Sequence, residues 1–140
     1  AKGSEQRRGL CVQLLDLDFF KQINDKHGHL AGDAVLREVA TRLTATLPAN
    51  TAIGRWGGEE FILLFEQINS SDAQIWAEKV RLAIAGTPVS FENLAISIST
   101  SIGIACNRDI NAHSSDPLLA AADTALYRAK NQGRNRVETA

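Results

Sequence analysis

Four carboxylates beside predicted strand ends are the residues of this chain best suited to chemistry. Asp16 and Asp18 close an apolar run, and Glu59 and Glu60 follow two glycines within Gly57–Phe61. If the two strands are neighbours, the four carboxylates converge. Hard divalent ions such as Mg²⁺ take one or two carboxylates plus substrate phosphates, and two such ions can clamp the oxygens of a phosphoryl transfer. The alternative is that these acids are solvated strand ends.

Basic residues near the C-terminus could meet phosphates. Lys130 and Arg134 are four residues apart around Gly133, with Arg136 beyond them. They could form a triphosphate clamp, or they could only complement the negative end of a helix. Lys21, just after the acidic strand end, is a further candidate cation or an ordinary surface lysine.

A third polar group, Asn24, His29 and Asp33, precedes the first long predicted helix. Asn and Asp side chains can bind the edge of a guanine, where a carboxylate accepts from the base N–H groups. The alternatives are a turn at Asn24, a helix cap at Asp33 and a buried, hydrogen-bonded His29.

The elements that position these groups are predicted from periodicity. Residues 10–17 form an apolar run typical of a buried strand. Apolar residues at three- and four-residue steps between 36 and 47 predict an amphipathic helix that Pro48 ends. Gly57-Gly58 predicts a hairpin turn, because adjacent glycines can both adopt positive φ. Further predicted elements are strands at 51–56 and 61–65, a helix at 76–84, a strand at 95–105, a helix from an Asp116 N-cap to about Asn131, and a short strand at Val137.

The order of these elements predicts an α+β (mixed α/β) fold, with a central mixed, largely antiparallel sheet, surrounding helices and a hairpin over 52–65. A chain of 140 residues, 44% of them apolar, suits one domain. We expect residues 1–9 to be a disordered or cloning-derived N-terminus and residues 10–140 to form the domain.

Composition excludes several classes of protein. A net charge of −1 and a pI near 6.3 argue against a nucleic-acid binder. No apolar run is long enough to span a bilayer, so we expect a soluble, cytoplasmic segment. Cys11 and Cys106 lack metal-ligand spacing, and we expect both to be reduced thiols.

Taken in order, the motifs resemble those of the GGDEF domain, the catalytic module of diguanylate cyclases. The resemblance runs from about residue 10 to residue 137. It rests on D-x-D-x-F-K-x-x-N-D at 16–25, G-H-x-x-G-D at 28–33, the G-G-E-E-F hairpin at 57–61, S-x-G-x-A at 101–105, and A-D-x-A-L-Y-x-A-K-x-x-G-R-N at 122–135.

The resemblance implies a role for each matching residue. Asp16, Glu59 and the Leu17 carbonyl would hold Mg²⁺, or Mn²⁺ as an alternative, with two ions per site and with Glu60 assisting. Glu59 would also accept the proton of the attacking hydroxyl, and Lys21 would steady charge on the phosphates. The substrate-binding residues implied are Asn24 and Asp33 for guanine, His29 for the pocket wall, Gly58 for ribose access, and Phe19, Phe20, Lys130 and Arg134 for phosphates.

The implied reaction condenses two GTP into cyclic di-GMP and two pyrophosphates, across a homodimer of domains with a palm-like nucleotide cyclase fold. The implied setting is bacterial second-messenger signalling, with an upstream sensory or regulatory domain, in the cytoplasm or as the cytoplasmic part of a membrane-anchored sensor. An alternative is a weak or inactive GTP-binding regulatory module of the same fold. A third hypothesis is a relative of palm-type polymerases. The lack of an extended basic surface argues against it.

Two departures from the family pattern matter. The family's inhibitory product site is an R-x-x-D before the hairpin, whereas residues 48–51 here are Pro-Ala-Asn-Thr. We therefore expect no feedback inhibition through that site. The family's D-x-L-T-x-L-x-N-R segment and helix do not precede the first strand, so we expect the isolated domain to dimerise poorly and turn over slowly.

Overall fold

A five-stranded sheet forms the centre of the computed structural model, which describes residues 9–107 and 115–140. The strand order is β2-β3-β1-β6-β7, and only the β6–β7 pair is parallel. The strands are β1 (Gly9–Leu17), β2 (Ala52–Gly57), β3 (Glu60–Ile68), β6 (Thr100–Cys106) and β7 (Val137–Thr139). The predicted α+β class with a mixed, largely antiparallel sheet is therefore confirmed.

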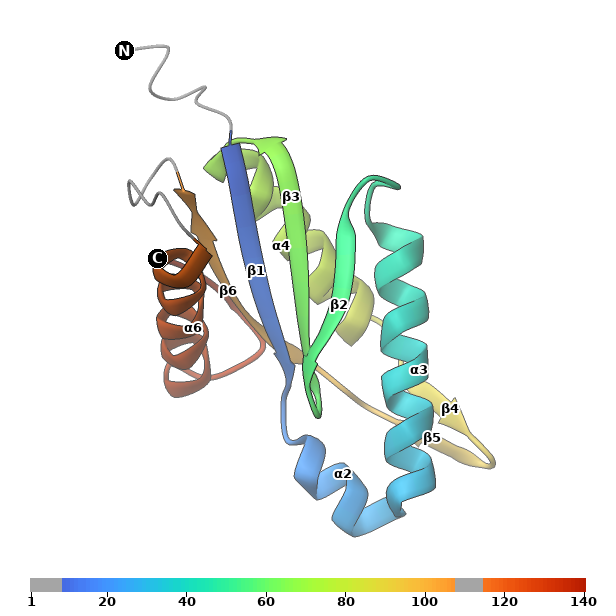
Figure 1. Ribbon diagram of the computed structural model, residues 1–140. Helices are drawn as coiled ribbons and strands as arrows, with labels where there is room; N and C mark the ends of the chain where they lie inside the picture. The colour runs from blue at the N-terminus through green and yellow to red at the C-terminus, as the bar shows by residue number, and fades with distance from the viewer. Residues whose placement is uncertain (1–8, 108–114) are drawn as a thin grey trace.

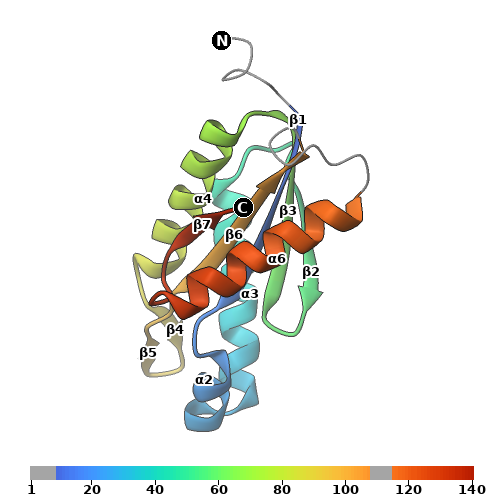
Figure 2. The same cartoon turned by 90° about the vertical axis from the view of Figure 1, so that its left-hand side faces the viewer.

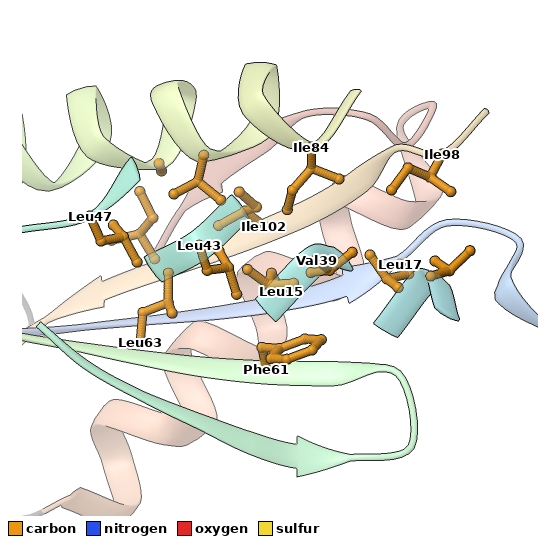
Figure 3. Close-up of a cluster of buried hydrophobic side chains, with 14 of the residues drawn as sticks. Leu15, Leu17, Val39, Leu43, Leu47, Phe61, Leu63, Ile84, Ile98 and Ile102 are labelled. Atoms are coloured by element: carbon orange, nitrogen blue, oxygen red, sulfur yellow. The ribbon is translucent and has the colours of Figure 1, made fainter. Parts of the chain in front are cut away.

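Four helices accompany the sheet in the described part of the chain: α2 (Phe20–His27), α3 (His29–Thr46), α4 (Ser70–Ala85) and α6 (Ser115–Asn131). Helices α3 and α4 cover one face, and α6 covers the other (Figures 1 and 2). Successive side chains of a strand point to opposite faces, so Leu15 joins the α3–α4 core (Figure 3) while Leu14 joins the α6 core. Burial on both faces explains why β1 is almost continuously apolar.

Gly103 sets the distance between α6 and the sheet. A Cβ at this position would lie 2.3 Å from both the Ala122 carbonyl oxygen and the Leu126 backbone nitrogen. Only glycine permits so close an approach of helix to strand. The position of α6, and of the lysine near its C-terminal end, therefore depends on this glycine.

The strand predicted over 95–105 is wrong in part. Residues Leu94–Ile96 form β5, which pairs with β4 (Val89–Phe91) in a separate hairpin, and residues 97–99 belong to neither sheet. The alternation of Ile with Ser and Thr suits both strands, so periodicity could not show where the chain changes partner. The strand β4 was not predicted.

The turn of the main hairpin also differs from the prediction. Strand β2 extends through Gly57, and the turn consists of Gly58 and Glu59. Neither hairpin glycine has positive φ; among the described glycines, only Gly28 and Gly133 do. The register shifts between Arg55 and Gly57, and this bulge displaces the turn by one residue.

The prediction of two reduced thiols is contradicted. Cys11 and Cys106 lie directly opposite each other on β1 and β6, and they form a disulfide across a sequence separation of 95 residues. The pairing of these two strands brings the sulfur atoms together, and no local spacing could indicate it.

Candidate active site at the hairpin end of the sheet

The C-terminal end of β1, the β2–β3 turn and α2 lie at the same end of the molecule (Figure 1). A hollow of about 400 Å³ lies there. Seven predicted site residues line it, namely Asp16, Phe19, Phe20, Lys21, Glu59, Lys130 and Arg134. The structure thus brings together the predicted acidic and phosphate-binding groups.

Three carboxylates concentrate negative charge beside this hollow. Asp16 lies directly opposite Glu60 on the paired strands β1 and β3, and the Leu17 N–H donates to the Glu59 carbonyl at 3.3 Å. Burial raises the pKa of Asp16, although its hydrogen bond to Lys130 opposes the rise. Burial, and then the charge of Asp16, raise the pKa of Glu60. Burial and mutual repulsion thus disfavour the charged forms of Asp16 and Glu60, and nearby positive charge would favour them.

Lys130 supplies part of that charge. Its ammonium donates to Asp16 Oδ2 from near the C-terminal end of α6. The side chain of Asp16 is only 8% exposed and that of Lys130 is 31% exposed, so the pair is largely shielded from water.

Asp18 does not join the other three acids, contrary to expectation. Its Oδ1 accepts from the Ser101 hydroxyl at 2.7 Å, and its Oδ2 accepts from the Ser99 hydroxyl at 2.6 Å and the Asn135 N–H at 2.9 Å. These three donors occupy the carboxylate. Asp18 therefore ties the loop after α6 to the end of β1.

The remaining acids fit a hard divalent cation by their chemistry. Residues 9–107 and 115–140 contain no group of three or more His, Cys, Asp or Glu side chains already arranged to hold a metal. However, Asp16, Glu59 and Glu60 offer the oxygen donors that Mg²⁺ prefers. In this structure the Lys130 ammonium is the cation that contacts Asp16.

The start of α2 offers donors to phosphate. Phe19 precedes the helix in the left-handed region at φ 57°, and no side chain caps the first turn. The first N–H groups of the helix therefore lack intrahelical partners, which favours an anion there. The Arg134 guanidinium lies 4.7 Å from the Phe19 ring centroid, while the exposed Lys21 pairs with Asp25 at 3.4 Å.

The residues predicted to bind guanine are spread more widely. Asn24 has a buried Oδ1 with no hydrogen-bond partner among the described residues, and a Cβ on Gly32 would lie only 1.8 Å from this oxygen. Asp33 is an exposed residue of the second turn of α3, so it is not a cap, and it lines a separate hollow of about 270 Å³. His29 is exposed rather than buried.

Comparison with protein families shows to which family the chain belongs. The family described as "Diguanylate cyclase, GGDEF domain" matches residues 1–136. The chain belongs to the GGDEF domain family. The resemblance seen in its motifs is therefore confirmed over nearly the whole chain.

Curated relatives of this GGDEF domain are longer proteins. Diguanylate cyclase A of Treponema denticola is 39% identical over 134 residues, which cover 95% of this chain and 36% of that protein. Diguanylate cyclase DgcP of Pseudomonas aeruginosa is 41% identical over 131 residues, covering 94% of this chain and 19% of that protein. The chain thus spans well under half the length of these relatives.

Solved structures share the fold. The GGDEF domain of YfiN (TpbB) from Pseudomonas aeruginosa aligns with a TM-score of 0.90 at 35% identity, covering 99% of this chain and 86% of that chain. A structure titled as the active GGEEF domain of a diguanylate cyclase from Vibrio cholerae aligns with a TM-score of 0.82 at 32% identity, covering 99% and 86%.

Sequence reasoning missed some residues around the site. Gln22 and Asp25 line the 400 Å³ hollow, and the charge of Asp123 contributes to the raised pKa of Glu60 after burial and Asp16. Asp123 and Lys130 are seven residues apart, a spacing that places them on one face of α6. That spacing was the available signal.

Proposed function

We propose that this GGDEF domain is catalytically active and condenses two GTP into cyclic di-GMP and two pyrophosphates. The supporting observation is the 400 Å³ hollow, in which Asp16 and Glu59 lie with Lys130 and Arg134 beside the intact Gly57–Phe61 hairpin. The reaction needs acidic side chains to bind a cation and basic side chains to bind phosphates, and both kinds line this hollow.

The proposed metal site consists of Asp16, Glu59 and the Leu17 carbonyl, with Glu60 in support. Bound Mg²⁺, or Mn²⁺, with two ions per site, would neutralise charge on the reacting phosphates. Glu59 would take the proton of the 3′-hydroxyl as the bond from the 3′-oxygen to the α-phosphorus forms. The bond from the α-phosphorus to pyrophosphate breaks in the same displacement.

The phosphates would be held by the first N–H groups around Phe19 and Phe20, by Lys130 and by Arg134, with Lys21 steadying the charge of the transition state. Fixed donors of this kind stabilise developing charge without reorganising during the reaction. On nucleotide binding, Lys130 would exchange the Asp16 carboxylate for a phosphate oxygen.

The nucleoside would lie toward α2 and α3. Asn24 Oδ1 is buried without a hydrogen-bond partner among the described residues, so its side chain would have to turn for this oxygen to accept from a guanine N–H. Asp33 would accept from the same edge of the base, and His29 would line the pocket. A Cβ on Gly58 would meet no atom within 4 Å, and the φ of Gly58 is not positive. Neither packing nor conformation in the described chain requires glycine there, which supports a role in leaving room for ribose.

Each domain would hold one GTP, so two domains must face each other for the attack. The relatives are longer, and one structural neighbour at 34% identity, SiaD of Pseudomonas aeruginosa, is titled as a complex with its activator SiaC. We therefore propose a homodimer controlled by an upstream sensory or regulatory domain, in the cytoplasm. No helix in the described residues is long and apolar enough to cross a membrane.

The test is product formation from GTP and Mg²⁺ at high protein concentration, followed as pyrophosphate and cyclic di-GMP. We expect Glu59→Ala to lower the rate at least ~100-fold, as loss of a proton acceptor and charge ligand does. Glu66→Ala, at an exposed position on the strand β3 that follows Glu59, is the control and should keep the rate. GTP binding without turnover, even with two domains fused in tandem, would instead establish an inactive binding module.

A further inference from the structure

A second hollow, of about 560 Å³, lies between α2 and residues 95–99. It shares Phe19 and Gln22 with the candidate active site, but none of the acidic or basic side chains of that site line it. The β4–β5 hairpin and α2 project from the same end of the sheet (Figure 2). A hollow of this volume lies within the usual range for small-molecule sites.

The hollow has an apolar wall and a cationic edge. Ile23, Ile96 and Ile98 contribute the apolar wall and are each less than 9% exposed. Lys26 and His27 line it from the last turn of α2, and no carboxylate among the described residues forms an ion pair with Lys26.

The one acid of the lining, Asp18, forms no ion pair with Lys26. Its two oxygens are held by three hydrogen bonds from Ser99, Ser101 and Asn135 instead. Positive charge beside an apolar wall matches a ligand that has an apolar body and an anionic group.

We propose that this hollow is a binding site for a small amphipathic anion, an aromatic or aliphatic body bearing a carboxylate, sulfonate or phosphate. The apolar body would lie against the isoleucines, and the anionic group would face Lys26. Of the residues assigned to the proposed reaction, Phe19 alone lines this hollow.

Phe19 connects the hollow to the active site. The same residue lines both hollows, precedes the first turn of α2 and has its ring beneath the Arg134 guanidinium. An occupant that contacts the ring therefore changes the affinity for nucleotide, and nucleotide changes the affinity for the occupant by the same factor. This coupling rests on the proposed function, whereas the binding site itself does not.

The probe is anilinonaphthalene sulfonate, an aromatic anion whose fluorescence rises in apolar surroundings, titrated into the whole chain. Lys26→Glu should weaken binding about fivefold or more, because it replaces an attractive charge by a repulsive one. Lys79→Glu on α4, outside the hollow, should leave it unchanged. Ser97→Phe, which fills the hollow from an exposed position, should abolish binding, whereas Ser90→Phe on β4 should not. Near-ultraviolet circular dichroism checks that each variant is folded.

Equal dye binding in all four variants would overturn the site and would leave Lys26 as a simple complement to the negative end of α2. For the coupling, the affinity of a non-hydrolysable GTP analogue should change about threefold or more with saturating dye, and not in Ser97→Phe. An unchanged affinity would refute the coupling. A domain that binds dye but no GTP analogue would refute the proposed function and leave the second site standing.

Discussion

Replacing Glu60 by Gln should stabilise the domain at neutral pH while lowering its proposed activity. Glu60 and Asp16 lie directly opposite each other on paired strands, so their charges repel. No described residue forms a hydrogen bond or an ion pair with the Glu60 carboxylate, so the substitution leaves no partner unsatisfied.

The size of the effect follows from this geometry. Like charges directly opposite each other on two strands cost on the order of 0.2–1 kcal/mol. The entropy of unfolding of a chain this long is roughly 0.3 kcal/mol/K, so relief of the repulsion should raise the Tm by about 1–3 °C.

The sign of the pH dependence separates this cause from general effects of the substitution. The pKa of Glu60 is raised in the folded state, by burial first and then by Asp16. The folded state therefore binds more protons than the unfolded state between the two pKa values, and stability falls as the pH rises through that window. The Glu60→Gln substitution removes this loss, so the gain should be present at about pH 7.5 and absent at about pH 3.5, where the carboxyl is protonated in both states.

The assay is urea denaturation at both pH values without divalent cation, with Glu66→Gln as the control on the same strand. Adding Mg²⁺ should then stabilise the parent domain more than the variant, because a ligand of the folded state stabilises it in proportion to its affinity. A variant that is less stable at neutral pH, or equally stabilised at both pH values, would show that repulsion from Asp16 is not the cause.

Three further outcomes are expected. Gly103→Ala should destabilise the domain by about 2–3 kcal/mol in urea denaturation, because the new Cβ would lie 2.3 Å from two backbone atoms of α6. An unchanged midpoint of urea denaturation would mean that α6 can move away at little cost. Without reductant, the unfolded chain should show no thiol that reacts with Ellman's reagent, and two reactive thiols would contradict the disulfide. Reduction should lower the free energy of unfolding by up to about 4–5 kcal/mol, because the disulfide closes a loop across 95 residues. Cyclic di-GMP at micromolar concentration should not slow turnover, because residues 48–51 lack the Arg and Asp of the family's inhibitory site. Part of this segment instead lines a hollow with the acidic Glu66 and Asp72, whose charge disfavours an anionic ligand. Inhibition at that concentration would contradict the prediction.

Local pattern was enough to predict most of the fold. The run at 10–17 and the strand at Val137 proved to be β1 and β7, and Val39, Leu43 and Leu47 are buried as their spacing predicts. What failed depended on pairing between distant segments. The disulfide, the division of 95–105 between two sheets and the bulge that moves the hairpin turn all arise where strands meet, and periodicity along one strand carries no such information.

The candidate site divides in the same way. Residue types and order were enough to bring Asp16, Glu59, Lys130 and Arg134 to one hollow. Chemical type alone could not show which carboxylates are already occupied by hydrogen-bond donors of the chain. Asp18 resembles Asp16 in every local respect, yet its carboxylate is occupied by three donors from segments more than 80 residues away in sequence.

The Asp16–Lys130 ion pair connects the two halves of the proposed site. The proposed chemistry assigns Lys130 to a phosphate and Asp16 to a cation, whereas the structure pairs them with each other. A cation bound alone would displace the lysine and leave it unpaired, and a phosphate bound alone would leave Asp16 unpaired in a largely buried position. Leaving one member of such a pair without a partner is costly, so the arrangement favours binding of nucleotide and divalent cation together. If both ligands bind as proposed, each would therefore raise the affinity for the other.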